Sequence, residues 1–136
     1  MSEKHTYNLE HILLLNSSFT RTWNIDFESK EFDSSVDIEV EDKRSDNTLT
    51  VVVNLTFTAG TNKEKQINAY IQMVGVFTTS ESLDLDIDKF ATVNAPAIIY
   101  PFIREHLSSL SVKAGINPIL LAPVNFVKRS QSEKNK

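Results

Sequence analysis

Residues 94–126 form the one long stretch whose apolar spacing fits a helix, and this stretch constrains the fold of the whole chain. Asn94 is suited to cap the helix start, because its side-chain oxygen can accept a bond from a free N–H of the first turn. Pro96 follows where a missing N–H costs little, and Gly115 offers a left-handed stop. Pro101 lies inside the pattern and predicts a kink or an early break. Apolar residues recur at spacings of three and four on one face: Ile98, Ile99, Phe102, Ile103, Leu107 and Leu110.

The rest of the chain has the alternating pattern of β-strands. Val36, Ile38 and Val40, for example, point to one face of their strand, while acidic residues point to the other. Hairpin-like links between consecutive strands predict an antiparallel sheet. A four-stranded antiparallel sheet followed by a long helix and a short C-terminal helix is an α+β fold. The four expected strands cover residues 9–19, 35–42, 48–60 and 65–79.

Residues 20–34 have no clean period and predict a long irregular connection that lays aromatic side chains over the sheet. The chain as a whole carries more aromatic residues than one small core needs. Exposed apolar surface rimmed by polar residues marks binding sites, and such surface suits extended, unfolded chains of varied sequence. Trp23, Phe27 and Phe32 in this connection are therefore candidates for an exposed groove.

Length and composition exclude several classes of protein. A chain of 136 residues predicts a single domain over residues 1–136, with polar, frayed ends at 1–6 and 127–136. The net charge of −4 argues against a nucleic-acid binder. The chain has no cysteine, no apolar leader and no apolar run long enough for a membrane helix, which fits a cytoplasmic protein.

No motif in the sequence predicts catalysis, a cofactor or a bound metal. The three histidines, His5, His11 and His106, are far apart and lack metal-ligand spacing. Asp84, Asp86 and Asp88 lack the glycine and the closing glutamate of a calcium loop. Three acidic side chains share one face of the second strand without apolar neighbours to separate their pKa values, so we expect a solvated surface: Asp37, Glu39 and Glu41.

The C-terminal stretch also carries a resemblance to a known family. It reads N-A-P-A-I-I-Y-P-F-I-R-E, then a short helical run, then G-I-N-P-I-L-L-A-P-V-N-F. In order, spacing and residue type, this resembles the C-terminal signature of the SecB export chaperones over about thirty residues. The rest of the chain is similar to the family more loosely, in the same order.

The resemblance implies a cytosolic, ATP-independent holdase that binds non-native preproteins in apolar grooves and passes them to SecA. It also implies a homotetramer built as a dimer of dimers, with a four-stranded sheet and a long helix in each subunit. Together with the surplus aromatics it predicts a client-binding groove at Trp23, Phe27, Phe32, Ile67, Phe77 and Phe126. The expected oligomer interface consists of Ala69, Ile71, Met73, Tyr100 and Ile103. The first strand, residues 9–19, has apolar residues on both faces and is also expected to be covered in part by another subunit.

One departure from the family pattern bears on partners. The acidic positions that the family uses to dock SecA fall at Asn16, Thr20 and Tyr70, none of which is acidic. The acidic row on the second strand is the candidate replacement for partner docking. Some relatives serve as chaperones for antitoxins, so the alternative is a specialist that holds a single partner of that kind.

Overall fold

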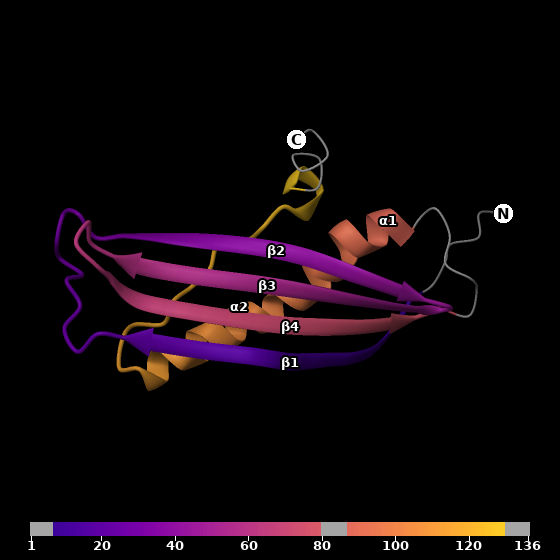
Figure 1. Cartoon of the computed structure of the whole chain (residues 1–136), viewed down its shortest axis with the longest axis horizontal. Helices are drawn as coiled ribbons and strands as arrows, with labels where there is room; N and C mark the ends of the chain where they lie inside the picture. The colour runs from indigo at the N-terminus through magenta and orange to yellow at the C-terminus, as the bar shows by residue number, and fades with distance from the viewer. Residues whose placement is uncertain (1–6, 80–86, 130–136) are drawn as a thin grey trace.

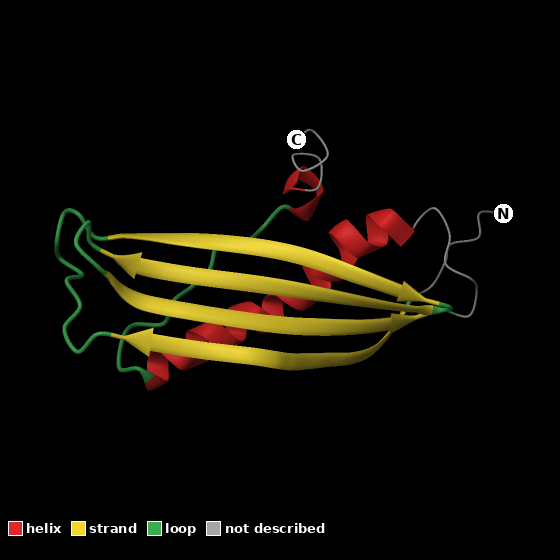
Figure 2. Ribbon diagram, viewed as in Figure 1, coloured by secondary structure: helices red, strands yellow, loops and turns green. Residues whose placement is uncertain are grey.

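A computed structural model gives the structure of this chain, and it describes residues 7–79 and 87–129. Four antiparallel strands make one sheet in the order β1-β4-β3-β2. The expected sheet, long helix and short C-terminal helix are confirmed, the last as a single helical turn at residues 126–129 (Figures 1 and 2). The strands are β1 (Asn8–Arg21), β2 (Asp33–Ser45), β3 (Thr48–Gly60) and β4 (Lys65–Thr78).

The loop between β1 and β2, residues 22–32, crosses the end of the sheet. It must be long because β1 and β2 lie at opposite edges, and Figure 1 shows it at the end where β3 turns into β4. We call this segment the crossing loop. At the other end, β2 and β3 join through a tight turn in which Asp46 takes a positive φ of 53°. An aspartate tolerates this left-handed conformation better than most residues.

The helical part begins earlier than the sequence predicts. It starts at α1 (Ile87–Lys89), continues through a π-helical segment (Phe90–Asn94) and ends with α2 (Ala95–Lys113). Asn94 has helical backbone angles and makes no side-chain cap, so the predicted capping role is wrong. The π turn, in which the Ala95 N–H donates to the Phe90 carbonyl, comes directly before Pro96, which has no N–H to donate.

The predicted early break at Pro101 is also wrong, because α2 runs through it. Ile99 and Ile103, on either side of Pro101, are fully buried against the sheet. Burying side chains of this size contributes about 1.5–3 kcal/mol each, which offsets the cost of a proline in a helix interior. The predicted stop is confirmed, since Gly115 has a φ of +76° directly after the last turn.

The core lies between α2 and one face of the sheet. Alternate residues of β3 and β4 point to the helix, which confirms the period-two prediction for these strands. Gly75 permits a close contact between sheet and helix, because a Cβ there would lie 2.9 Å from the Ile99 Cδ1. The fully buried aliphatic side chains of this layer include Leu49, Val51, Val53, Leu55, Ile71, Ile99, Ile103 and Leu107.

Among the described residues, no helix is long and apolar enough to cross a membrane.

Candidate functional site

A cavity of about 220 Å³ lies where three segments meet at the loop end of the sheet. The crossing loop forms one wall, and the ends of β3 and β4 form the floor. The opposite wall is the segment after α2, residues 116–125, which we call the strap. Figure 2 shows the strap leaving the end of α2 and running back past the sheet toward the β2 side. The lining residues are Phe27, Phe32, Ser34, Phe57, Ala59, Ile67, Ile116, Asn117 and Ile119.

Two aromatic rings form the loop wall of this cavity. The Phe27 and Phe32 rings lie 5.2 Å apart between centroids and are tilted by 53°. Phe27 is 52% exposed, which is unusual for so large an apolar side chain beside a core. Its other side borders a second, more open hollow whose lining includes Asp26, Glu28 and Glu31. The apolar cavity is therefore rimmed by acidic groups on the loop side.

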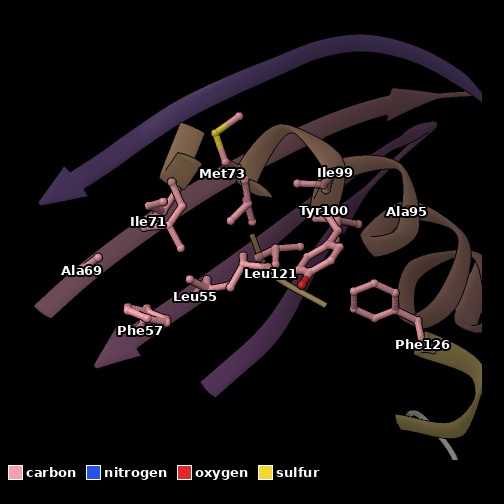
Figure 3. Packing of buried hydrophobic residues seen from close by; sticks show 14 of the residues in the cluster. Leu55, Phe57, Ala69, Ile71, Met73, Ala95, Ile99, Tyr100, Leu121 and Phe126 are labelled. Atoms are coloured by element: carbon pink, nitrogen blue, oxygen red, sulfur yellow. The ribbon is translucent and has the colours of Figure 1, made fainter. Parts of the chain in front are cut away.

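The strap wall is fixed by hydrogen bonds from α2. Ser111 is fully buried, and its Oγ accepts the Ile119 N–H at 2.9 Å while donating to the Ser108 carbonyl at 2.7 Å. Further along, the Tyr100 hydroxyl donates to the Ala122 carbonyl at 2.6 Å. The Tyr100 ring also meets the Phe126 ring edge-on at 5.8 Å, as Figure 3 shows. These contacts hold an irregular segment against the helix over most of its length.

Tyr100 reports on this attachment through its pKa. Burial raises the pKa of the Tyr100 phenol above its usual value near 10, and the charge of Arg104 opposes the rise. The neutral phenol is thus the form that the folded chain prefers. It is also the form that can donate to the Ala122 carbonyl.

The structure brings together only part of the predicted groove. Phe27, Phe32 and Ile67 share the cavity, whereas Trp23 is 91% exposed on the crossing loop and does not line it. Phe77 lies at the opposite end of β4, buried against Phe90 at 5.1 Å. Phe126 is buried as well, against Tyr100. Phe77 and Phe126 therefore pack in the core instead of lining the groove.

The residues predicted at the oligomer interface do not lie on the surface of the subunit. All five are buried within this chain, on the layer between sheet and α2: Ala69, Ile71, Met73, Tyr100 and Ile103. The alternation in β4 was read correctly, but the chain's own helix covers that face. These residues contribute to the subunit core, which corrects the predicted interface role.

The inter-subunit surface expected on β1 stays a prediction, whereas the strap was not predicted as part of the site. Two register shifts in β1, at Leu9/His11 and Leu14/Asn16, break its simple alternation. The leucines of this edge strand are well exposed, with Leu15 at 59%. Ile116 and Ile119 of the strap, three residues apart and beyond the glycine stop, were the available signal for the second wall of the cavity.

The acidic row lies on the sheet face that α2 does not cover. Asp37, Glu39 and Glu41 are exposed and line a shallow cavity of about 180 Å³ with neighbours from β3 and β4. A hydrogen-bonded row crosses the strands there. The Tyr70 hydroxyl and the Gln72 amide both donate to the Asn54 Oδ1 at 2.9 Å, and the Asn54 amide donates to Glu41 at 3.4 Å. This row orders the surface that surrounds the three carboxylates.

No arrangement in the described residues indicates catalysis or metal binding. Ser17 and His106 share a hydrogen bond of 2.8 Å between β1 and α2, at an exposed position. Residues 7–79 and 87–129 contain no group of three or more metal-ligating side chains close enough to hold an ion. Asp84 and Asp86 lie outside the described residues, and Asp88 is exposed and forms an ion pair with Arg44. The apolar cavity and the acidic face remain as candidate binding surfaces.

Comparisons with known proteins identify the family of this chain. Residues 7–136 match the family model described as preprotein translocase subunit SecB. A protein-export protein SecB from Halorhodospira halophila is 31% identical over 109 residues, which cover 78% of this chain and 63% of that protein. Its counterpart from Rickettsia akari is 29% identical over 99 residues, covering 71% and 63%. The matched region thus spans slightly less than two thirds of these relatives.

Solved structures share the fold at lower identity. A SecB-like chaperone from Mycobacterium tuberculosis, in complex with a ChAD peptide from the HigA1 antitoxin, superposes with a TM-score of 0.76 at 13% identity. The superposition covers 88% of this chain and 91% of that one. A protein of unknown function from Streptococcus agalactiae gives a TM-score of 0.51 at 10% identity, covering 89% and 100%.

Replacing Tyr100 by phenylalanine should lower the free energy of unfolding by about 1 kcal/mol at pH 7, because the Ala122 carbonyl loses its donor.

The raised pKa of Tyr100 also determines how the stability of the chain changes with pH. The unfolded phenol ionises first, so the native chain loses stability as pH rises from about 10 toward the folded pKa. Urea unfolding at pH 7 and pH 10.5 should show a smaller alkaline loss in Tyr100→Phe than in the parent chain. An equal loss in both proteins would contradict this account of Tyr100.

Proposed function

Since the chain belongs to the SecB family, we propose that it is a non-catalytic, ATP-independent holdase of the cytoplasm that binds non-native proteins in the cavity between crossing loop and strap. The observation that carries this proposal is the composition of that cavity. Six of its nine lining residues are large apolar side chains, which come from the crossing loop, β3, β4 and the strap, and Phe27 is half exposed beside it. Apolar surface left open in this way is typical of a site that awaits a partner.

The size of the cavity supports an extended chain as the ligand. About 220 Å³ is below the roughly 300–1,000 Å³ of pockets that enclose drug-sized molecules. A space of this size suits one or two side chains of a segment that continues along the surface. The carboxylates on the outer side of the crossing loop would favour segments with basic residues near the apolar ones.

We place the export role and SecA docking within the same proposal. Relatives carry the name protein-export protein, and the uncovered sheet face presents Asp37, Glu39 and Glu41 to solvent. A shallow polar surface with a hydrogen-bonded row and three like charges can attract a basic surface on a partner. This acidic row would take over the docking role of the family positions that are not acidic here.

The oligomer interface is proposed on β1 instead of β4. β1 is a 14-residue edge strand with unpaired backbone groups on its outer side, and several of its leucines are exposed. An exposed, leucine-rich edge is a template for pairing with another chain. Pairing of β1 with β1 of a second copy would start the dimer of dimers that we propose.

A specialist role is the second candidate, and one observation favours it. The mycobacterial structure with the same fold is a complex with an antitoxin peptide. The same cavity in this chain could hold one dedicated partner of that kind. Purification from the native host with mass spectrometry separates the two roles, because an export chaperone would retain many presecretory proteins and a specialist one partner in stoichiometric amount.

Substituting Phe27 by serine should weaken binding of an unfolded protein about tenfold, since part of one large apolar contact is lost, equivalent to about 1.4 kcal/mol. The measurement is fluorescence titration with lysozyme that has been reduced and alkylated so that it stays unfolded. Phe102→Ser is the matched control, because Phe102 is similarly exposed, at 46%, and lies on α2 outside the cavity. Equal loss in both variants would argue against this cavity as the site.

Two substitutions test the interface proposal against the earlier one. Ile71→Asp should unfold or strongly destabilise the subunit, by about 3–5 kcal/mol, because it leaves an unpaired charge in the core. Leu14→Asp combined with Leu15→Asp should leave the subunit folded and reduce the mass found by light scattering. A folded Ile71→Asp variant with reduced mass would return the interface to β4.

The acidic row predicts a salt-dependent interaction. Neutralising it as Asp37→Asn, Glu39→Gln and Glu41→Gln should weaken binding of purified SecA at least tenfold at low salt, and the difference should shrink as ionic strength rises. The same variant should bind unfolded lysozyme as the parent chain does, because the row lies on the other face of the sheet. Unchanged affinity for SecA in calorimetry would remove the docking assignment.

A further inference from the structure

The loop wall of the cavity is hydrogen-bonded to a buried side chain of the sheet. Gln66, the second residue of β4, is only 3% exposed although its amide is strongly polar. Its Oε1 accepts the Asp26 N–H at 2.9 Å, and its Nε2 donates to the Asp26 carboxylate at 3.0 Å. The same Nε2 approaches Glu64 at 3.3 Å. Gln66 thus binds the backbone and the side chain of one crossing-loop residue at once.

These bonds reach both aromatic rings of the cavity wall. Phe27 directly follows Asp26 in the chain. The Asp26 carbonyl accepts the Ser29 N–H at 3.0 Å, and the Ser29 carbonyl accepts the Phe32 N–H at 3.1 Å. The start of the loop is tied to the same residue, because the Thr22 N–H donates to the Gln66 carbonyl at 2.9 Å. A shift of the Gln66 amide would therefore displace the segment that carries Phe27 and Phe32.

The other two walls do not depend on this contact. The floor consists of paired residues of β3 and β4, and the strap is fixed by the buried Ser111 hydroxyl. The crossing loop also lacks regular structure, and besides the packing of Ile25 and Phe32 against the core, its Asp26 is bound to the sheet through Gln66. The separation between the loop and the strap, which an incoming chain must fit, is consequently set from the loop side.

We propose that Gln66 is a positioning residue that holds the aromatic wall of the cavity ready for a client and thereby sets how long the client stays bound. The inference rests on the proposed holdase function and adds to it the residue that orders the site. A wall that is ordered before binding saves the entropy of ordering it during binding, so its loss shows mainly as faster release.

The test replaces Gln66 by glutamate, which keeps the shape of the side chain and turns its donor into an acceptor. The new carboxylate would face Asp26 and Glu64 and should release the loop. We expect release of alkylated, unfolded lysozyme to become about tenfold faster by stopped-flow. Asn68→Asp is the control, since it adds the same charge at an exposed position two residues along the same strand.

A second readout needs no client. Trp23 is the single tryptophan of the chain and lies on the crossing loop, where its carbonyl accepts a bond from Arg21 at the end of β1. Its fluorescence anisotropy should fall in Gln66→Glu and stay unchanged in Asn68→Asp. Urea unfolding of each variant shows whether the rest of the fold persists under the assay conditions.

The reciprocal exchange separates positioning from general destabilisation. In a Gln66→Glu, Asp26→Asn double variant the new amide can donate to the new carboxylate, and the backbone N–H keeps an acceptor. Recovery of slow release and of high anisotropy supports the proposal. Slow release in Gln66→Glu alone, or failure of the double variant to recover while it remains folded, would overturn it. If the parent chain binds no unfolded protein, the holdase proposal fails instead, and the anisotropy still reports on the loop.

Discussion

The contact between α2 and the face formed by β3 and β4 is the constraint on which the rest of the molecule depends. It is close because Gly75 has no side chain, and a Cβ at that position would meet Ile99 and the Phe77 ring at 2.9 Å. The helix is thereby fixed along the sheet, with Ile99, Ile103 and Leu107 fully buried. Its C-terminal end comes to lie beside the loop end of the sheet, where the strap begins. The location of the cavity follows from the position of the helix.

The candidate site is assembled from parts of the chain that have little structure of their own. Phe27, Phe57, Ile67 and Ile119 are far apart in the sequence and meet only at the end of the sheet. Polar bonds from regular elements hold the irregular segments: Arg21 at the end of β1 donates to the Ala114 carbonyl at 2.6 Å and to the Trp23 carbonyl at 2.8 Å. Rigid scaffold and adaptable loops are thus separated, as is usual where proteins bind partners.

Much of the scaffold could be predicted from the sequence, because its signals are local. Alternation in residues 48–60 matched β3 in full, and Gly115 marked the end of the helix. The start of the helix could not be predicted in this way, since the π-helical segment before Pro96 depends on packing that no residue pattern records. Of the residues expected at the groove, Phe27, Phe32 and Ile67 line one cavity, and their role in binding stays a prediction. Phe77 and Phe126 were misplaced, because an aromatic residue gives no local sign of whether the core will cover it.

The same lack of a local signal for burial explains why core residues of β4 were predicted at the oligomer interface. A strand with one apolar face requires a cover, and the sequence does not say whether that cover is the chain's own helix or a neighbour. For Ala69, Ile71 and Met73 it is the helix. The two register shifts in β1 also left no sign in the sequence, and the leucines of this edge strand are exposed in the single chain.

The two edges of the sheet differ in a way that bears on assembly size. β2 carries seven charged residues among its thirteen, and the Arg129 side chain donates to its Ile38 carbonyl. β1 carries two charged residues among fourteen, besides one histidine. A sheet whose two edge strands can both pair with other chains can add copies without limit and grow into a fibre. Charged side chains on one edge strand prevent pairing there and stop that growth. If chains pair through β1, as proposed above, edge-to-edge addition would close after two chains, because the other described edge of the sheet is charged. Such pairing would not extend into a fibre.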